Sequence, residues 1–337
     1  MVFLVKRATS MKCVFFIVLL LNSLILAQGA GYLDSESDQI LVFATKGSIF
    51  DQARNGLINE IRDDFTVSVI ELDENTSTEY IDSVINGYDL PKAAVLIGNN
   101  AIRSYIKYSN KNRQKTEPIQ VVTILALDVQ RAVSGLENVN AIAYETPMLT
   151  ALVSFRRTFN KPVDKVGVLY RNSLKSFIEK HTHYCAKEKI SIRGIEISDD
   201  TSKIQLDIAS ALQNLIGNEK VDALWIPNDN VLLKPEFLGN IWFPALKKKK
   251  IPLIVGVEAL VNPELNFGTF AVIPDPVALG EQAAEIIYNL KSDDWQHTGI
   301  MIHPAISMYS VLNIKKAYEI AAKEDFKTYE VSKILKK

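Results

Sequence analysis

The sequence predicts an α/β protein made of two doubly wound parallel-sheet lobes joined by a multi-crossing hinge. Three observations lead to this prediction. The chain has 337 residues, which is longer than a domain with a single hydrophobic core usually is. Its apolar runs are short and continuous, which is typical of parallel strands buried on both faces, and they alternate with helical patterns in two successive series. Apolar residues make up 47% and charged residues 23%, an ordinary globular composition that excludes disorder.

The first series of alternating elements predicts the first lobe. The predicted strands are the apolar runs at residues 40–44, 66–72, 93–97, 120–125 and 141–144. Between these runs, apolar residues at helical spacing predict helices over residues 52–62, 77–86 and 100–108. Strands that are connected in this way by helices form a parallel sheet covered on both faces.

The second series begins after residue 146 and predicts the second lobe. Its predicted strands are residues 166–170, 191–197, 223–226, 252–255 and 269–272. Its predicted helices are residues 147–159, 174–188, 204–215 and 235–246. A second complete set of strand-helix units indicates a second sheet rather than an extension of the first.

The last part of the chain holds more predicted structure than the second lobe needs. It predicts a helix over residues 277–290, a strand at either 300–302 or 308–312, and a helix over 314–322. We therefore expect the chain to return to the first lobe and to cross once more, which makes a hinge whose rotation is guided. The expected lobes are residues 30–146 plus 274–304 and residues 147–273 plus 305–337.

The N-terminus has the features of an export signal. Three basic residues precede an apolar run at residues 14–26, and small residues follow it at the two cleavage positions. The apolar run has 13 residues, fewer than the roughly 20 that a spanning helix needs, so residues 1–29 are predicted to be a cleavable signal peptide. The mature protein is then periplasmic or secreted; an uncleaved anchor, and a start at Met11, are the alternatives. Cys13 precedes the apolar run, so a lipoprotein is not predicted.

Charge and cysteine content argue against several classes of protein. Removal of residues 1–29 takes away three basic residues and no acidic ones, which leaves 35 Lys and Arg against 39 Asp and Glu. This balance provides no basic surface for a phosphate backbone, so no nucleic-acid partner is expected. Cys185 is then the remaining cysteine and has no partner for an internal disulfide. His181, His183 and Cys185 lie on a predicted helix without sharing one face, so no metal site is expected.

Catalytic motifs are missing from the sequence. It contains no glycine-rich nucleotide loop, no Gly-x-Ser-x-Gly elbow and no His-Glu-x-x-His motif. The protein is therefore expected to use no cofactor and not to be an enzyme. An enzyme that uses Asp128, Glu145 and Asp229 as facing carboxylates is the alternative, although hydrogen bonding to a ligand ammonium is a simpler role for them.

Polar residues follow the predicted strands. Ligands of parallel α/β sheets bind outside the carboxyl ends of the strands, so two facing lobes form one cleft there. Phe50 is the candidate for stacking on a planar ligand, and the polar side chains suit a polar small molecule. Helix N-capping is the alternative role of the Ser, Asn and Asp residues. The candidate ligand-binding residues are Ser48, Phe50, Asn99, Asn100, Asp128, Glu145 and Thr146 in the first lobe, and Asn172, Ser173, Asp229, Asn230 and Glu258 in the second.

Four segments resemble one family of ABC-transporter substrate-binding proteins. They are residues 166–173 (VGVLYRNS), 221–230 (VDALWIPNDN), 251–258 (IPLIVGVE) and 268–284, which includes LGEQAA. The family has the type I periplasmic-binding fold, and its studied members bind tryptophan and other aromatic amino acids. The first lobe departs from the family pattern, because residues 127–129 (LDV) lack the family's proline.

The resemblance implies an extracytoplasmic solute-binding protein of an ABC importer, which closes two lobes on a small polar molecule such as an aromatic or other amino acid. It implies an ABC permease in the membrane as partner, and we expect the protein to be a monomer. Because the first-lobe motifs depart from the family, a periplasmic sensor that signals through a membrane kinase or chemoreceptor is the alternative. Family contacts would fall on Ser48, Asn99, Asn100, Asp128, Asn172, Ser173, Asp229 and Glu258.

Overall fold

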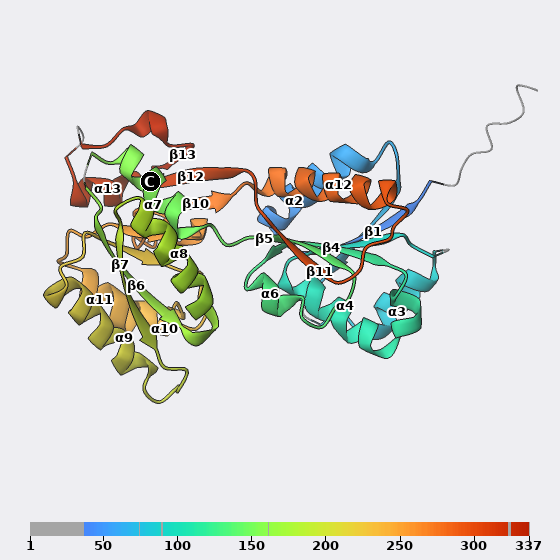
Figure 1. Cartoon of the computed structure of the whole chain (residues 1–337), viewed down its shortest axis with the longest axis horizontal. Coiled ribbons are helices and arrows are strands. Elements are labelled where there is room, and N and C mark those ends of the chain that lie inside the picture. Colours follow the sequence, from blue (N-terminus) through green and yellow to red (C-terminus); the bar gives the residue numbers. More distant parts are fainter. Residues whose placement is uncertain (1–36, 74, 89, 161, 323–324, 337) are drawn as a thin grey trace, which may run out of the picture.

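The computed structural model describes residues 37–336, apart from residues 74, 89, 161 and 323–324. Two α/β lobes lie end to end along the long axis of the molecule, and each has a sheet between two layers of helices (Figure 1). The predicted signal peptide, residues 1–29, lies outside the described residues. In the described part of the chain, no helix is both long and apolar enough to cross a membrane.

The sheet of the first lobe has six strands in the described chain, in the order β11-β5-β4-β3-β1-β2. Each neighbouring pair is parallel. The central strands β3 and β4 are buried along their whole length, as expected for continuous apolar runs covered on both faces. The strands are β1 (Gln39–Thr45), β2 (Thr66–Leu72), β3 (Ala93–Ile97), β4 (Gln120–Ala126), β5 (Val139–Ala143) and β11 (Ile300–Pro304).

Helices α2 (Ser48–Ile61) and α12 (Pro276–Ser292) cover one face of this sheet. The other face carries α3 (Thr78–Asn86), α4 (Asn99–Lys111) and the short helix α6 (Val129–Ala132) (Figure 1). The short helix α5 (Arg113–Thr116) follows α4 and contacts it. Glycines allow α2 and α12 to pack backbone against backbone: a Cβ atom at Gly280 would lie 2.1 Å from the carbonyl oxygen of Ala53. The helix of the returning chain segment is thereby built into the first lobe.

The sheet of the second lobe has seven strands in the described chain, in the order β13-β12-β10-β9-β8-β6-β7. This sheet is mostly parallel, and the prediction is wrong for two strands at one edge: β12 runs antiparallel to β10, and β13 runs parallel to β12. The reason is the path of the chain: β10 leaves this lobe towards the first, and β12 returns from it at the same end. The strands are β6 (Lys165–Arg171), β7 (Ser191–Ile197), β8 (Ala223–Ile226), β9 (Leu253–Val255), β10 (Phe270–Pro274), β12 (Met308–Asn313) and β13 (Lys333–Leu335).

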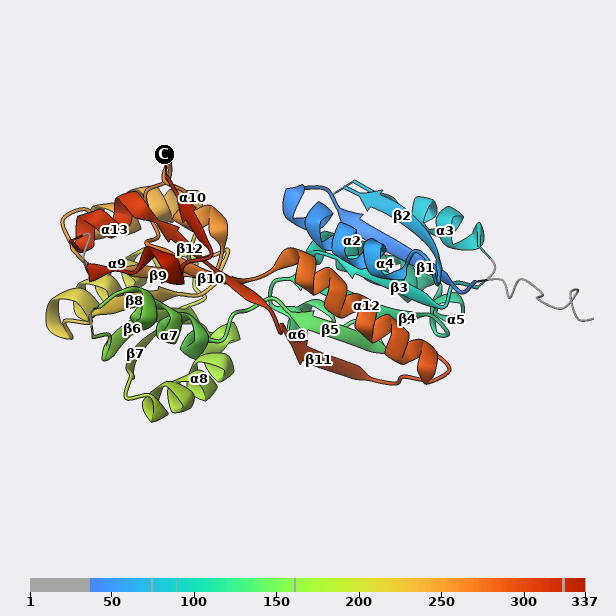
Figure 2. The same cartoon turned by 90° about the horizontal axis from the view of Figure 1, so that it is seen from above.

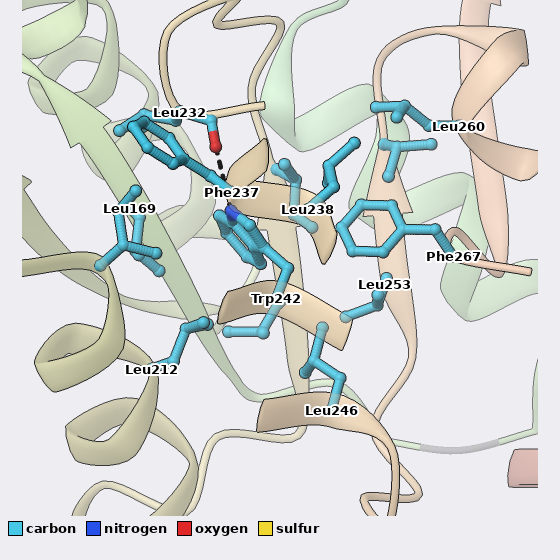
Figure 3. Packing of buried hydrophobic residues seen from close by; sticks show 14 of the residues in the cluster. Leu169, Leu212, Leu232, Phe237, Leu238, Trp242, Leu246, Leu253, Leu260 and Phe267 are labelled. Carbon is cyan, nitrogen blue, oxygen red and sulfur yellow. Dashed lines mark hydrogen bonds between the residues drawn. The ribbon is translucent and has the colours of Figure 1, made fainter. Parts of the chain in front are cut away.

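One face of the second sheet is covered by α7 (Met148–Thr158), α8 (Lys175–Lys187) and α13 (Ile314–Ile320). On the other face, Trp242 is buried in a cluster of leucines and phenylalanines, and its indole Nε1 donates a hydrogen bond to the Leu232 carbonyl at 3.0 Å (Figure 3). The predicted helix over 235–246 is divided by a π-helical turn. The helices of this face are α9 (Ile204–Gln213), the π-helical turn η2 (Asn214–Asn218), α10 (Pro235–Phe237), the π-helical turn η3 (Leu238–Trp242) and α11 (Phe243–Leu246).

Three crossings connect the lobes in the described chain, at β5 to α7, β10 to α12 and β11 to β12 (Figure 2). Both segments considered for the last strand are strands, β11 in the first sheet and β12 in the second. The crossings are hydrogen-bonded to one another: the Thr146 hydroxyl donates to the Val272 carbonyl at 2.7 Å, and the Asp275 amide donates to the Ser307 carbonyl at 3.1 Å. These bonds restrict how the lobes can rotate relative to each other.

Candidate functional site

The candidate site is a cleft between the lobes, at the carboxyl ends of the strands. It consists of a larger pocket of about 740 Å³ and a smaller pocket of about 250 Å³. Both pockets have walls from both lobes, and they share Asn99 and Leu127 of the first lobe. A ligand could therefore extend from one pocket into the other.

The larger pocket is mainly apolar on its first-lobe side. Phe50 lies there against Gly98, whose φ of 91° favours glycine, and a Cβ atom at Gly98 would come within 2.8 Å of the ring. The absence of a side chain at position 98 thus lets the Phe50 ring approach the end of β3. The pocket is lined from the first lobe by Ser48, Ile49, Phe50, Gln52, Asn99, Leu125, Leu127, Tyr144 and Pro276, and from the second by Val257, Glu258, Ala259, Asn262, Pro263, Tyr309, Lys333, Leu335 and Lys336.

Glu258 is the acidic residue of this pocket, and it is held by two partners. The Tyr309 hydroxyl donates to its Oε2 at 2.7 Å, and the Lys333 ammonium donates to its Oε1 at 2.5 Å. Burial opposes ionisation, but the hydrogen bonds from Lys333 and Tyr309 prevail and lower the pKa of Glu258. Burial, with a smaller contribution from the charge of Glu258, raises the pKa of Tyr144 to about 12, so its hydroxyl stays protonated at neutral pH.

Asp229 is the most enclosed carboxylate of the smaller pocket, with a side chain only 2% exposed. It accepts two hydrogen bonds from Nε of Arg171, at 2.8 and 3.1 Å. It also accepts from the backbone amides of Val231 and Leu232, at 2.8 and 3.0 Å. Arg171 extends the network to Asp199 at 2.9 Å. Asp229 therefore serves its own lobe, where it fixes the loop after β8 and orients Arg171.

The loops of the first lobe are held in the same manner. The Asn99 side chain donates to the Leu127 carbonyl and accepts from the Leu127 amide, each at 2.9 Å. Asp128 has a left-handed backbone with φ 51°, and its amide donates to Glu145 Oε1 at 2.5 Å. Burial raises the pKa of the Glu145 carboxyl, although backbone amides partly oppose this shift. These bonds fix the loop after β4 through contacts within the first lobe.

The predicted site residues divide into those that meet in the cleft and those that lie elsewhere. Thr146 is buried in the hinge. Asn172 lines a groove beside β7 and α9, away from the first lobe. Asn100 follows Asn99 on α4 but is not part of either pocket wall. The residues brought together in the two pockets are Ser48, Phe50, Asn99, Asp128, Glu145, Ser173, Asp229, Asn230 and Glu258.

Several lining residues were not identified from the sequence. Arg103 lies one helical turn after Asn99 on α4, and this spacing could have indicated that it shares the cleft face. Arg131 follows Asp128 by three residues in α6 and lines the same pocket. Lys333, in contrast, reaches the cleft only because β13 pairs with the returning strand β12. No local pattern identifies a contact of that kind.

The remaining candidates for metal or thiol chemistry in the described residues are the histidines and Cys185. The described chain contains no group of three or more His, Cys, Asp or Glu side chains that could hold a metal ion. Burial lowers the pKa of His181 to about 4 and raises the pKa of Cys185 to about 11. At neutral pH the imidazole is therefore uncharged and the thiol is protonated, as expected for buried residues on α8.

Comparison with known proteins shows similarity in structure. No family model matches the sequence, and no curated protein matches it. An open, ligand-free substrate-binding protein with adhesive properties from Clostridium difficile is similar with a TM-score of 0.60 and 15% identity, over 89% of this chain and 100% of that one. An ABC domain in complex with L-Trp from Streptococcus pneumoniae has a TM-score of 0.53 and 17% identity, over 88% and 100%. A conserved domain protein from Vibrio cholerae has a TM-score of 0.53 and 15% identity, over 88% and 99%. The chain thus has a fold like that of type I periplasmic-binding proteins.

Proposed function

We propose that the protein is an extracytoplasmic solute-binding protein of an ABC importer, whose two lobes close on a small polar molecule. The observation that carries the proposal is the cleft itself, which joins an aromatic pocket and a charged pocket and takes walls from both lobes. Two structurally similar proteins, a substrate-binding protein and an ABC domain with bound L-Trp, support the same class. An aromatic amino acid is therefore the first ligand to test.

Binding would act by shifting the population from the open to the closed arrangement. A ligand held by Phe50 in the first lobe and Tyr309 in the second contacts both walls fully when the lobes approach each other. Only such a difference in contacts between open and closed forms can shift the equilibrium. A membrane permease that recognises the closed pair of lobes then receives the solute.

The proposal does not include catalysis. Asp229 and Glu258 are each engaged by a cation within the second lobe, and Glu145 accepts a backbone amide. A general acid or base has to exchange its proton with a substrate at hydrogen-bond distance. Side chains that are already engaged in this way are better suited to hold the loops in place.

The test combines calorimetric binding with small-angle X-ray scattering. L-Tryptophan, L-tyrosine and L-phenylalanine are titrated first, followed by purines and small peptides. We expect at least one solute to bind and to decrease the radius of gyration. Phe50→Ala should weaken binding by about tenfold or more, because it removes the aromatic wall. Tyr80→Ala, which removes an exposed ring on α3, is the matched control and should leave binding unchanged. Absence of binding and closure across the whole panel would refute the proposal.

The alternative is a sensor with the same closing mechanism. The departures of the first lobe from the importer family at residues 127–129 favour it. Gene deletion separates the two functions: loss of solute uptake supports import, whereas intact uptake with a lost transcriptional or chemotactic response supports sensing.

A further inference from the structure

Two of the four carboxylates that line the cleft are paired with the protein's own cations. Glu258 is paired with Lys333, and Asp229 is paired with Arg171. Both pairs lie within the second lobe, so they do not depend on how close the lobes are to each other. A ligand ammonium would have to compete with these internal partners for the same oxygen atoms, and it would also leave the displaced cation without a partner.

The cations on the facing side of the smaller pocket are free. Arg103 on α4 and Arg131 on α6 both line this pocket, and in the described chain neither guanidinium makes a hydrogen bond or an ion pair. The carboxylate of Asp128 is likewise unengaged there. Glu145, which also lines this pocket from the first lobe, accepts the Asp128 amide and has no cation paired with it in the described chain, but burial raises the pKa of its carboxyl. The two free guanidinium groups thus share the pocket with one free carboxylate and one carboxyl that is held by the backbone. Guanidinium groups bind carboxylate and phosphate oxygens through parallel hydrogen bonds.

The second lobe adds neutral donors opposite these arginines. Ser173 and Asn230 are exposed, line the same pocket, and have side chains that make no hydrogen bond in the described structure. Ser173 lies in the turn after β6 and Asn230 in the loop that Asp229 holds. On closure they would approach the group that the arginines bind. A hydroxyl and an amide stabilise an anion without adding charge of their own.

We propose that the cleft selects an organic anion: its apolar, preferably aromatic body lies in the larger pocket, its acidic group lies against Arg103 and Arg131, and no ammonium group is required. The two pockets meet at Asn99 and Leu127, so one molecule can occupy both. This inference rests on the proposed solute-binding function and narrows the ligand to a class of charge and shape.

Three related compounds test this selection. Indole-3-propionate retains the ring and the carboxylate, tryptamine retains the ring and the ammonium, and L-tryptophan carries both charges. By calorimetry we expect indole-3-propionate to bind at least as tightly as L-tryptophan, and tryptamine to bind at least tenfold more weakly. Arg103→Gln and Arg131→Gln should each weaken the binding of indole-3-propionate by about tenfold, the usual size of one lost charge-assisted hydrogen bond.

Arg157→Gln is the matched control, since Arg157 is an exposed arginine on α7 outside both pockets. It should leave the affinity unchanged, and circular dichroism checks that all variants are folded. Tighter binding of tryptamine than of indole-3-propionate overturns the inference, as does unchanged affinity in both cleft variants. If neutral or cationic solutes close the lobes and indole-3-propionate does not, the inference fails while the proposed function stands. If no solute closes the lobes, the proposed function itself fails.

Discussion

The close contact between helices α2 and α12 can be tested by replacing Gly280 with alanine. A methyl group at Gly280 would lie 2.1 Å from the Ala53 carbonyl oxygen and 2.5 Å from the Leu57 backbone nitrogen. Real Cβ contacts are rarely shorter than 3.0 Å, and both neighbours are backbone atoms that have no rotamer to change. The two helices would therefore have to move apart by about 1 Å, which loosens the packing of α12 on the first lobe.

The magnitude follows from two opposing effects. Overpacking of this kind costs about 3 kcal/mol, at the upper end of the usual range, because backbone rather than side chain must move. Alanine in a helix interior is favoured over glycine by about 1 kcal/mol. The net expectation is a loss of about 2 kcal/mol of unfolding free energy, or a Tm lowered by about 4–8 °C for a unit of this size.

Urea unfolding followed by circular dichroism measures this change. Gly239→Ala is the control, because Gly239 is also helical and exposed, and a Cβ atom there would meet nothing within 4 Å beyond its own helix. That variant should be as stable as the wild type or more stable by up to about 1 kcal/mol. If Gly280→Ala matches the wild type while Gly239→Ala behaves as expected, the helices do not approach each other as closely as described.

Three further changes test the second lobe. Asp229→Asn should lower the unfolding free energy by about 2 kcal/mol in urea titrations, since it leaves the Arg171 guanidinium with only the exposed Asp199 as counter-charge; a loss below about 1 kcal/mol would contradict the buried pairing. The pKa of Glu258 is lowered in the folded protein, so its pairing with Lys333 stabilises the fold above the unfolded pKa of about 4.3 and is lost as the pH falls through the folded pKa. Thermal midpoints between about pH 6 and pH 3 should therefore fall more steeply for the wild type than for Glu258→Gln, and equal slopes would contradict this. Trp242→Phe should cost about 2 kcal/mol, because it leaves the Leu232 carbonyl without its donor and opens space in the core; unchanged stability would show that the indole is not packed as in Figure 3.

The two-lobe fold was predictable because it depends on local patterns. Continuous apolar runs such as residues 93–97 form strands that are buried along their whole length. The short strand β13 was not predicted, since Lys333–Leu335 has three residues, begins with a lysine, and is a strand only through pairing with β12. Residues 235–246 were predicted as one helix, but the structure divides them into two short α-helices separated by a π-helical turn. Pro244, near the start of the second of these helices, lacks an amide donor.

The cleft was predictable in position but not in its charge. Polar residues after strands are a local feature, and nine of the candidates do line the two pockets. Which of them remain free depends on partners distant in sequence. Asp229 is bound by Arg171, 58 residues away, and Glu258 is bound by Lys333, 75 residues away. These pairings arise only when strands from separate parts of the chain meet in one sheet.

This division between engaged and free side chains bears on how binding could work. Asn99, Asp229 and Glu258 are held by hydrogen bonds within their own lobes, so the loops that carry them would need little further ordering if the lobes close as proposed. Preorganisation of that kind raises affinity because less conformational entropy is lost on binding. Under the proposed function, ligand recognition would fall to the side chains that have no partner in the described structure, and in the smaller pocket those include Arg103 and Arg131. Under the proposed selectivity, Asp229 and Glu258 form part of the scaffold of the site, although the sequence alone suggests that they bind a cation.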